Sequence, residues 1–243
     1  MPEGPSIVIA KEQTSQFIGN KVITATGNAK IDILRLENKK LLDIKTWGKH
    51  LLLCFEGFTI RIHFLLFGTY RINETKESQL RLGLVFPNGK LNIYTAAVKL
   101  LEGNINTYYN WTEDVMNDNW DAEAAYDKLN KMSGKLICDT LLEQDIFSGV
   151  GNIIKNEVLY RVYVHPESLT GKIPSDKKRE IIEQARQYSF DFLHWKKANV
   201  LKKHWLAHTK KTCLRCDLPL HKKYTGVKKR RSFYCTNCQN LYL

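Results

Sequence analysis

Residues 213–238 read CLRCDLPLHKKYTGVKKRRSFYCTNC, a stretch in which two Cys-x-x-Cys pairs are separated by 18 residues. Each pair can bind a metal ion from one tight turn, and a hairpin between the pairs would bring the four thiolates together. Disulfides are disfavoured in a chain expected to be cytosolic, and a redox-active Cys-x-x-Cys would be single. A four-sulfur site leaves no open coordination position, so the pattern predicts one structural Zn²⁺ with the ligands Cys213, Cys216, Cys235 and Cys238.

Most of the positive charge of the chain lies in the same region. The 243 residues include 37 Lys and Arg against 25 Asp and Glu, which gives a formal net charge of +12. Residues 201–243 contain eleven Lys or Arg and one acid, so about +10 of this charge lies there. A flexible basic tail would not carry four cysteines and several aromatic residues. The pattern indicates a metal-pinned basic hairpin, whose first expected partner is a nucleic acid or an anionic membrane surface.

The composition excludes several classes of protein. Hydrophobic residues make up 43% and charged residues 26%, which excludes collagen-like, mucin-like and wholly disordered chains. No stretch approaches the ~18 consecutive apolar residues of a membrane span. The first five residues, MPEGP, carry an acid where a secretory signal carries basic and apolar residues. We therefore expect an intracellular, cytoplasmic protein without a membrane partner.

Hydrophobic patterning divides the chain into a β-rich part and a helical part. A helix pattern covers residues 6–18, and strand patterns follow at 31–36, 41–44, 49–55, 59–64, 68–72, 80–86 and 90–94. Further helix patterns lie at residues 122–132, 135–143, 151–162 and 176–195. Short strands at this spacing favour an antiparallel sandwich or barrel. The predicted fold class is α+β and multidomain: a β-sandwich preceded by a helix, then a helical domain, then a zinc-ribbon hairpin.

The segment Gly149-Val150-Gly151-Asn152 precedes one of the predicted helices. No Lys-Ser/Thr follows it and no strand clearly precedes it, which excludes a P-loop. Glycines at a helix start let the backbone approach a phosphate, and the exposed N–H groups there attract an anion. Asn152 can cap this helix or donate its side-chain amide to a phosphate, and the local sequence leaves both roles open.

Several segments fall in the order of one known family. They are residues 1–5 (MPEGP), 47–52 (WGKHLL), 144–152 (QDIFSGVGN), 230–235 (RRSFYC) and the four cysteines. Together they resemble the formamidopyrimidine-DNA glycosylase/endonuclease VIII family of base-excision repair enzymes, and Gly4-Pro5 is more similar to the endonuclease VIII branch. The resemblance covers essentially the whole chain. It implies a catalytic β-sandwich domain at 1–112, a helix–two-turn–helix DNA-binding domain at 113–208 and a four-cysteine zinc finger at 209–243.

The resemblance assigns the chemistry to the start of the chain. Removal of Met1 would give Pro2 a free secondary amine, and an α-amino group has a pKa of roughly 7.7–8. In the family this amine attacks the sugar C1′ and expels the damaged base, and the resulting Schiff base allows β,δ-elimination. The glutamate that Glu3 matches transfers protons at the sugar ring oxygen. Without the resemblance, Pro2 and Glu3 would be an ordinary helix start, and the sequence leaves open whether Met1 is removed.

Three further positions match residues of the family that grip the DNA backbone. Lys49 matches a lysine that contacts a phosphate beside the lesion and supports catalysis. Asn152 matches the phosphate-binding asparagine of the helix–two-turn–helix, with Gly149 and Gly151 beside it. Arg230 matches the finger arginine by spacing, and Arg231 is a close rival because an insertion of one residue would exchange them.

Leu65, Leu66 and Phe67 align with the family segment that fills the gap left by the everted base. In a strand–turn context these residues could equally belong to the core, and both interpretations stay open. The position of Leu65 is often polar in the family, so a leucine there puts the preference for the opposite base in doubt.

The resulting hypothesis is a bifunctional DNA glycosylase and AP lyase that acts as a monomer on double-stranded damaged DNA, associated with the nucleoid. Oxidised pyrimidines are the expected substrates, and the alternative is the same chemistry on 8-oxoguanine and formamidopyrimidine purines. Two rivals come from other classes. One is a non-catalytic damaged-DNA-binding protein, and the other is an RNA or transcription module that would need neither Pro2-Glu3 nor Lys49.

Overall fold

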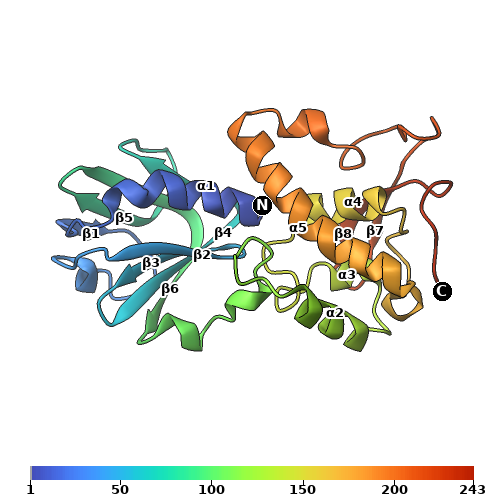
Figure 1. Ribbon diagram of the computed structural model, residues 1–243. Helices are drawn as coiled ribbons and strands as arrows, with labels where there is room; N and C mark the ends of the chain where they lie inside the picture. The colour runs from blue at the N-terminus through green and yellow to red at the C-terminus, as the bar shows by residue number, and fades with distance from the viewer. Residues whose placement is uncertain (1) are drawn as a thin grey trace. The chain divides into compact units, whose positions relative to one another are not determined.

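The computed structural model describes residues 2–243, and Met1 lies outside them (Figure 1). The chain divides into two compact units, of which the first ends at Asn110 and the second is Trp111–Leu243. The first is built on an antiparallel sheet, whereas the second is mainly helical and includes the four-cysteine segment. The predicted α+β class, with a β-rich part followed by a helical part and a terminal hairpin, is confirmed.

The first unit begins with helix α1 (Gly4–Thr14) and the 3-10 turn η1 (Ser15–Phe17). Pro5 lies in the first turn of α1, where its missing N–H costs no helical hydrogen bond. Ile7 and Ala10 are buried against the core of the unit. The helix packs against β2 and β3, so its N-terminal residues are fixed by the sheet and not only by the local sequence.

Six strands form one antiparallel sheet in the order β1-β5-β6-β4-β3-β2. Their bounds are β1 Thr24–Thr26, β2 Asp43–Trp47, β3 His50–Phe55, β4 Phe58–Ile72, β5 Leu80–Phe86 and β6 Gly89–Glu102. Residues 58–64 of β4 pair with β3 and with the second half of β6, whereas residues 69–72 pair with the first half of β6. One hydrophobic core collects residues from several strands, such as Ile60 of β4 and Leu84 of β5. The predicted antiparallel strands are present and form one six-stranded sheet.

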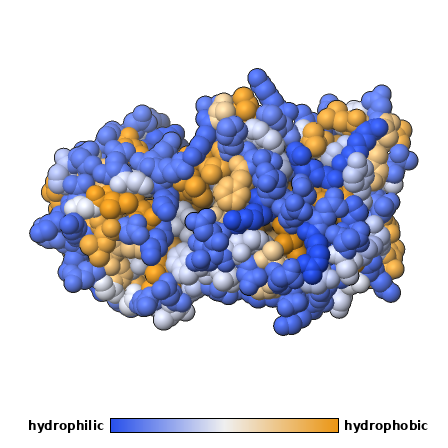
Figure 2. Space-filling view, viewed as in Figure 1, coloured by the Kyte–Doolittle hydropathy of each residue, from blue (hydrophilic) through white to orange (hydrophobic). Residues whose placement is uncertain are grey.

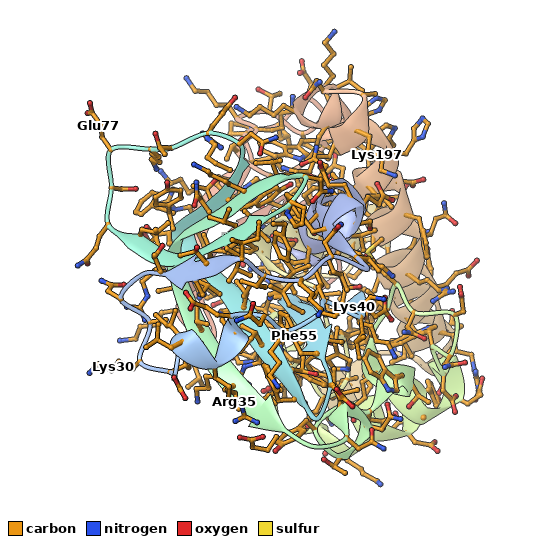
Figure 3. The ribbon with its side chains drawn as sticks, turned by 90° about the vertical axis from the view of Figure 1, so that its left-hand side faces the viewer. Lys30, Arg35, Lys40, Phe55, Glu77 and Lys197 are labelled. Carbon is orange, nitrogen blue, oxygen red and sulfur yellow. The ribbon has the colours of Figure 1, made fainter. Side chains whose placement is uncertain are left out.

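The structure corrects two strand predictions in this unit. Residues 59–64 and 68–72 are parts of the single strand β4, whose register against β6 shifts between Phe64 and Thr69. Residues 31–36 form no strand and instead contain the 3-10 turn η2 (Leu34–Leu36). Asp32 Oδ1 accepts the backbone N–H of Arg35 at 3.3 Å, and such local bonds compete with a strand ladder. Arg35 then lies over the ring of Phe58, on which Phe55 stacks. Figure 3 labels Arg35 and Phe55 among the side chains of this unit.

The second unit packs its helices around one hydrophobic core. The elements are η4 (Trp111–Glu113), α2 (Ala122–Lys131), α3 (Ile137–Thr140), α4 (Asn152–Arg161), η5 (Thr170–Lys172), α5 (Ser175–Lys197) and η6 (Leu201–His204). Two strands, β7 (His221–Thr225) and β8 (Arg230–Tyr234), form the hairpin between the cysteine pairs. The helix expected at 135–143 is only the single turn α3, because the chain enters consecutive turns after Thr140.

Hydrophilic residues cover much of the second unit on the face drawn in Figure 2, with hydrophobic residues in small groups between them. Across residues 2–243, no helix combines the length and the apolar character needed to cross a membrane.

Candidate functional site

The start of the chain places Pro2 and Glu3 immediately before α1. Glu3 is the N-cap residue, but its side chain makes no capping hydrogen bond to the helix. The Glu3 side chain is nevertheless 3% exposed, whereas Pro2 is partly exposed. Because Pro5 already occupies the first turn, an ordinary helix start does not account for Pro2. Pro2 in front of the helix and the buried Glu3 beside it therefore do not serve as an ordinary helix start or side-chain cap.

Lys49 lies in the two-residue turn between β2 and β3. Trp47 pairs with His50 across this hairpin, and Gly48 takes a φ of +52° in the turn. A tight hairpin turn needs a positive φ, which glycine adopts without a steric penalty. Lys49 is partly exposed at the tip of the hairpin. The sequence Trp-Gly-Lys-His thus presents a lysine on a turn that both strands hold in place.

Aromatic rings and two histidines pack beside Lys49. The His50 ring lies 5.4 Å from that of His63 and 5.7 Å from that of Trp47. The hydroxyl of Tyr109 lies 3.3 Å from His50 Nδ1. Arg61 lies on β4, and its Nε is buried without a hydrogen-bond partner among residues 2–243. The first unit therefore surrounds Lys49 with a polar cluster that the sequence patterns did not reveal.

The histidines of this cluster are neutral at physiological pH. Burial, followed by the positive charges of Arg61, His63 and Lys49, lowers the pKa of His50 to about 3. Burial, followed by Lys49 and Arg61, also lowers the pKa of His63. Burial raises the pKa of Tyr109 to about 12. The positive charge of the cluster thus comes from lysine and arginine and not from histidine, which suits a site that meets an anion.

The lowered pKa of the half-buried His50 makes the stability of the first unit depend on pH. Its pKa falls from 6.5 to about 3 on folding, so the unfolded chain binds the extra proton below pH 6.5 and stability falls as the pH falls toward 3. At pH 5 this linkage costs about 2 kcal/mol. Hydrogen exchange of the β2–β3 amides at pH 7 and pH 5 measures it. We expect His50→Gln to reduce this loss of protection between pH 7 and pH 5. The control His194→Gln, at an exposed position of α5, should leave the loss unchanged. If His50→Gln lost as much protection as the unchanged protein, His50 would not be the cause of the pH dependence.

Leu65, Leu66 and Phe67 lie where β4 leaves its ladder with β6. They are 43%, 57% and 76% exposed, which excludes them from the core. A Cβ on Gly68 would lie 2.6 Å from the carbonyl oxygen of Thr95, so the close approach of the two strands requires glycine there. Thr95 itself has a φ of +48°. The break in register therefore turns three apolar side chains outward.

The segment before α4 forms the turns of a helix–turn–helix arrangement. Gly149, with a φ of +99°, donates its N–H to Gln144 Oε1 at 3.2 Å. Gln144 in turn donates to the carbonyl of Val150 at 3.2 Å. Gly151 is the N-cap of α4, and Asn152 is its first residue. The Asn152 side chain therefore does not cap α4, which removes one of the two roles that the sequence left open.

Asn152 contacts the hairpin through the backbone of Arg231. Asn152 Nδ2 donates to the Arg231 carbonyl at 2.9 Å, and Asn152 Oδ1 is buried without a partner in the described chain. Asn156 Nδ2 and Lys155 Nζ donate to the same carbonyl at 3.2 and 3.4 Å. Three side chains of α4 thus converge on one carbonyl of β8.

The two arginines of the hairpin differ in their surroundings. The Arg231 guanidinium donates to the Tyr224 hydroxyl at 2.9 Å and lies over the Tyr224 ring. Arg230 is exposed and pairs with Thr225 at the end of the β7–β8 ladder. No hydrogen bond or ion pair to the Arg230 guanidinium occurs within residues 2–243. Arg230 is therefore the arginine whose donors face solvent.

The four cysteines of the last segment form one cluster. All four Sγ atoms lie within 4.8 Å of one another. The Cys216 and Cys235 sulfurs are 3.5 Å apart, and those of Cys213 and Cys238 are 3.8 Å apart. A tetrahedral ion with sulfur ligands at ~2.3 Å has sulfur–sulfur edges of about 3.8 Å. The cluster could hold a metal ion.

The sequence patterns missed the buried polar residues of α4. Lys155 and Glu157 are fully buried, and Asn156 is 2% exposed. The Glu157 carboxylate accepts the backbone N–H groups of residues 206, 207 and 208 at 2.7–2.9 Å. The available signal was three polar residues in a row between the apolar pairs Ile153-Ile154 and Val158-Leu159 of the helix NIIKNEVLYR, because a helix buried on one side cannot expose such a run completely to water. These residues tie α4 to the hairpin and to the chain leading into it.

Comparison with known proteins identifies what the chain is similar to. Residues 112–189 match the family model described as the formamidopyrimidine-DNA glycosylase H2TH domain. Endonuclease 8-like 3 of Xenopus laevis is 25% identical over 237 residues, which cover 90% of this chain and 38% of that protein. The formamidopyrimidine-DNA glycosylase of Lactobacillus helveticus (strain DPC 4571) is 25% identical over the full length of both proteins. The chain spans less than two fifths of the Endonuclease 8-like 3 relatives.

Solved structures share the fold. Lactococcus lactis formamidopyrimidine-DNA glycosylase, non-covalently bound to DNA that contains an AP site, matches with a TM-score of 0.87 and 21% identity. That match covers 98% of this chain and 99% of the other. A viral DNA glycosylase matches with a TM-score of 0.83 and 19% identity, over 98% of this chain and 100% of the other. The fold of the whole chain, from the sheet to the four-cysteine hairpin, is thus found in DNA glycosylases.

Proposed function

Because the chain belongs to the formamidopyrimidine-DNA glycosylase/endonuclease VIII family, we propose that it is a bifunctional DNA glycosylase and AP lyase of base-excision repair. The observation that carries the proposal is the start of α1. There a partly exposed Pro2 precedes the helix, and the buried Glu3 side chain does not cap it. The chemistry needs an amine nucleophile with an adjacent carboxyl group, and these two residues supply both.

Pro2 acts as the nucleophile once Met1 has been removed. Its nitrogen lone pair attacks the sugar C1′, and the bond from C1′ to the damaged base breaks. The sugar ring opens as an iminium forms between Pro2 and C1′, and Glu3 transfers the proton at the ring oxygen. The iminium acidifies the C2′ proton, so the 3′ phosphate leaves by β-elimination and the 5′ phosphate by δ-elimination. Water finally releases Pro2 from the sugar remnant.

The backbone of the DNA is gripped by residues of both units. We assign Lys49, on its fixed hairpin turn, to a phosphate beside the lesion, and Asn152 and Arg230 to phosphates of the same strand. Arg230 is preferred to Arg231 because the Arg231 guanidinium is engaged with Tyr224. The exposed Leu65, Leu66 and Phe67 would enter the space left by the everted nucleotide. The partner is double-stranded damaged DNA inside the cell, bound by a monomer.

We infer that the ion of the four-cysteine cluster is Zn²⁺. The sulfur–sulfur distances of 3.5 and 3.8 Å suit a tetrahedral zinc–thiolate site, and four sulfur ligands exclude the open position of a catalytic zinc. The ion holds Cys213, Cys216, Cys235 and Cys238 together and does not take part in the reaction.

The proposed substrates are oxidised pyrimidines. The likeness of Gly4-Pro5 to the endonuclease VIII branch supports this, as does the similarity to Endonuclease 8-like 3 over 90% of the chain. Wild-type Lactococcus lactis formamidopyrimidine-DNA glycosylase has been crystallised with DNA containing an oxidised pyrimidine, and a mutant of it with DNA containing Fapy-dG. The same fold therefore accepts either class of lesion, and oxidised purines are the alternative substrates.

Borohydride trapping tests the proposal. The protein, with removal of Met1 verified by mass spectrometry, is incubated with duplexes that carry an oxidised pyrimidine, 8-oxoguanine or an abasic site. Borohydride reduces the iminium to a stable amine, and peptide mapping locates the adduct. We expect an adduct on Pro2 with the pyrimidine lesion and with the abasic site. Preference for 8-oxoguanine would keep the mechanism and change the substrate, whereas no adduct even at the abasic site would leave a non-catalytic DNA-binding protein.

A further inference from the structure

The turn of the β7–β8 hairpin donates two backbone hydrogen bonds to a buried carboxylate of α3. Asp139 is 5% exposed, and its Oδ2 and Oδ1 accept the backbone N–H groups of Val227 and Lys228 at 2.8 and 3.1 Å. Gly226 begins the turn with a φ of +69°, and a Cβ there would collide with both carboxylate oxygens. Hydrogen bonds from N–H groups to an ionised carboxylate are stronger than neutral ones. One end of the turn is therefore fastened to α3.

The other side of the hairpin is fastened to α4. The Arg231 carbonyl accepts from Asn152, Asn156 and Lys155, as described above, and Lys155 Nζ also donates to Ser232 Oγ at 2.9 Å. Arg230 lies between the two fastenings, three residues after Val227 and one before Arg231. Its backbone is thus held from both sides, while its guanidinium has no partner within residues 2–243.

From this arrangement we propose that Asp139 is a positioning residue that sets the Arg230 guanidinium for its phosphate. The inference rests on the proposed function, in which Arg230 contacts DNA. Without the carboxylate, two N–H groups at the turn lose their acceptor, and the hairpin tip gains alternative conformations. Only a fraction of molecules would then present Arg230 correctly, and the apparent dissociation constant rises in inverse proportion to that fraction.

Asp139→Asn tests the proposal with little change in shape. The amide keeps one acceptor but places an NH₂ group against the second backbone N–H. We expect the Kd for a duplex with a tetrahydrofuran abasic-site analogue, measured by fluorescence anisotropy, to rise about tenfold. Glu143→Gln is the matched control, because the Glu143 side chain also reaches the hairpin turn, where it pairs with the side chain of Lys228 at 3.1 Å, but it accepts no backbone N–H of that turn; its other ion pair, at 3.3 Å, is with Lys135, which precedes α3. The control is expected to change the Kd less than about twofold.

A double-mutant cycle separates positioning from general stabilisation. If Asp139 acts through Arg230, the Kd of the Asp139→Asn/Arg230→Ala double variant equals that of Arg230→Ala within about twofold. The slope of log Kd against log salt should fall by about 0.9 in Arg230→Ala and by part of that in Asp139→Asn. If the changes in log Kd of the two single variants add in the double variant, the inference is overturned, because Asp139 would then affect binding independently of Arg230.

A second variant is needed in case Asp139→Asn unfolds the hairpin, because weaker binding would then not report on the position of Arg230. Gly226→Ala keeps the carboxylate but pushes the turn away from it, so it should raise the Kd and lose its effect in the Arg230→Ala background. Metal content shows for each variant whether the four-cysteine cluster stays intact. Unchanged binding by Arg230→Ala itself would refute the DNA contact of the proposed function. Binding weakened by Arg230→Ala but not by Asp139→Asn or Gly226→Ala would refute only the positioning role.

Discussion

Replacing Glu3 with Gln is expected to slow base excision by at least about 100-fold while leaving the affinity for DNA within about threefold. Gln is nearly isosteric with Glu but cannot transfer a proton, and positioned general acids and bases contribute typically 10²–10⁴-fold. Glu3 is 3% exposed and its side chain does not cap α1, so the nearly isosteric amide occupies the same space and removes no helix cap. The loss should therefore fall on the chemical step and not on binding.

Single-turnover rates on a duplex with an oxidised pyrimidine measure the chemical step, and anisotropy with the tetrahydrofuran duplex measures the affinity. Glu12→Gln is a suitable control, because Glu12 lies on an exposed position of the same helix and should excise at the rate of the unchanged protein. A Glu3→Gln variant that binds DNA at least tenfold more weakly would mean that the carboxylate holds the site together. A variant that excises at full rate would remove Glu3 from the reaction.

The parts of the site that depend on local spacing could be predicted from the sequence. Each Cys-x-x-Cys pair needs only a tight turn, and the 18 residues between the pairs are enough for one hairpin that brings them together; the structure places all four sulfurs within 4.8 Å of one another. The turn that carries Lys49 follows from Gly48 between two strand patterns. In both cases the geometry is set by turns and one hairpin within a single short segment of the chain, so the local pattern contains the information.

The parts that depend on tertiary contacts could not be predicted. Asp139 and Gly226 are 87 residues apart, and only the packing of α3 against the hairpin makes them neighbours. Whether Leu65, Leu66 and Phe67 are exposed or belong to the core depends on the shift in register between β4 and β6, and the sequence of β4 alone does not reveal that shift. The hydrogen bond from the Asn152 side chain to the Arg231 carbonyl joins residues 79 positions apart, so the local sequence of α4 could not reveal it. Register and long-range hydrogen bonds therefore limit the prediction more than secondary structure does.

Removing the metal is expected to unfold the four-cysteine hairpin while the first unit stays folded. The small core beneath the hairpin consists of Tyr160, Ala207, Cys213, Phe233 and Cys235, so two of its five buried residues are ligands of the proposed ion. A segment of this size is below the ~40 residues that usually fold without metal or disulfide support. Structural zinc contributes roughly 10–16 kcal/mol in zinc-finger peptides, which far exceeds what so small a core supplies.

Hydrogen exchange before and after chelation measures this effect. We expect the β7–β8 amides to lose protection, the β3–β4 amides to keep it, and the Kd for the tetrahydrofuran duplex to rise at least about 100-fold, because Arg230 and the Arg231 carbonyl lose their fixed positions. Added Zn²⁺ should restore both properties. Cys54→Ser, whose thiol lies in β3 outside the cluster, should retain one zinc per chain, and Cys235→Ser should not. Full protection of β7–β8 in protein verified as metal-free would contradict this prediction, because it would show that packing and the hydrogen bonds to α3 and α4 hold the hairpin without the ion.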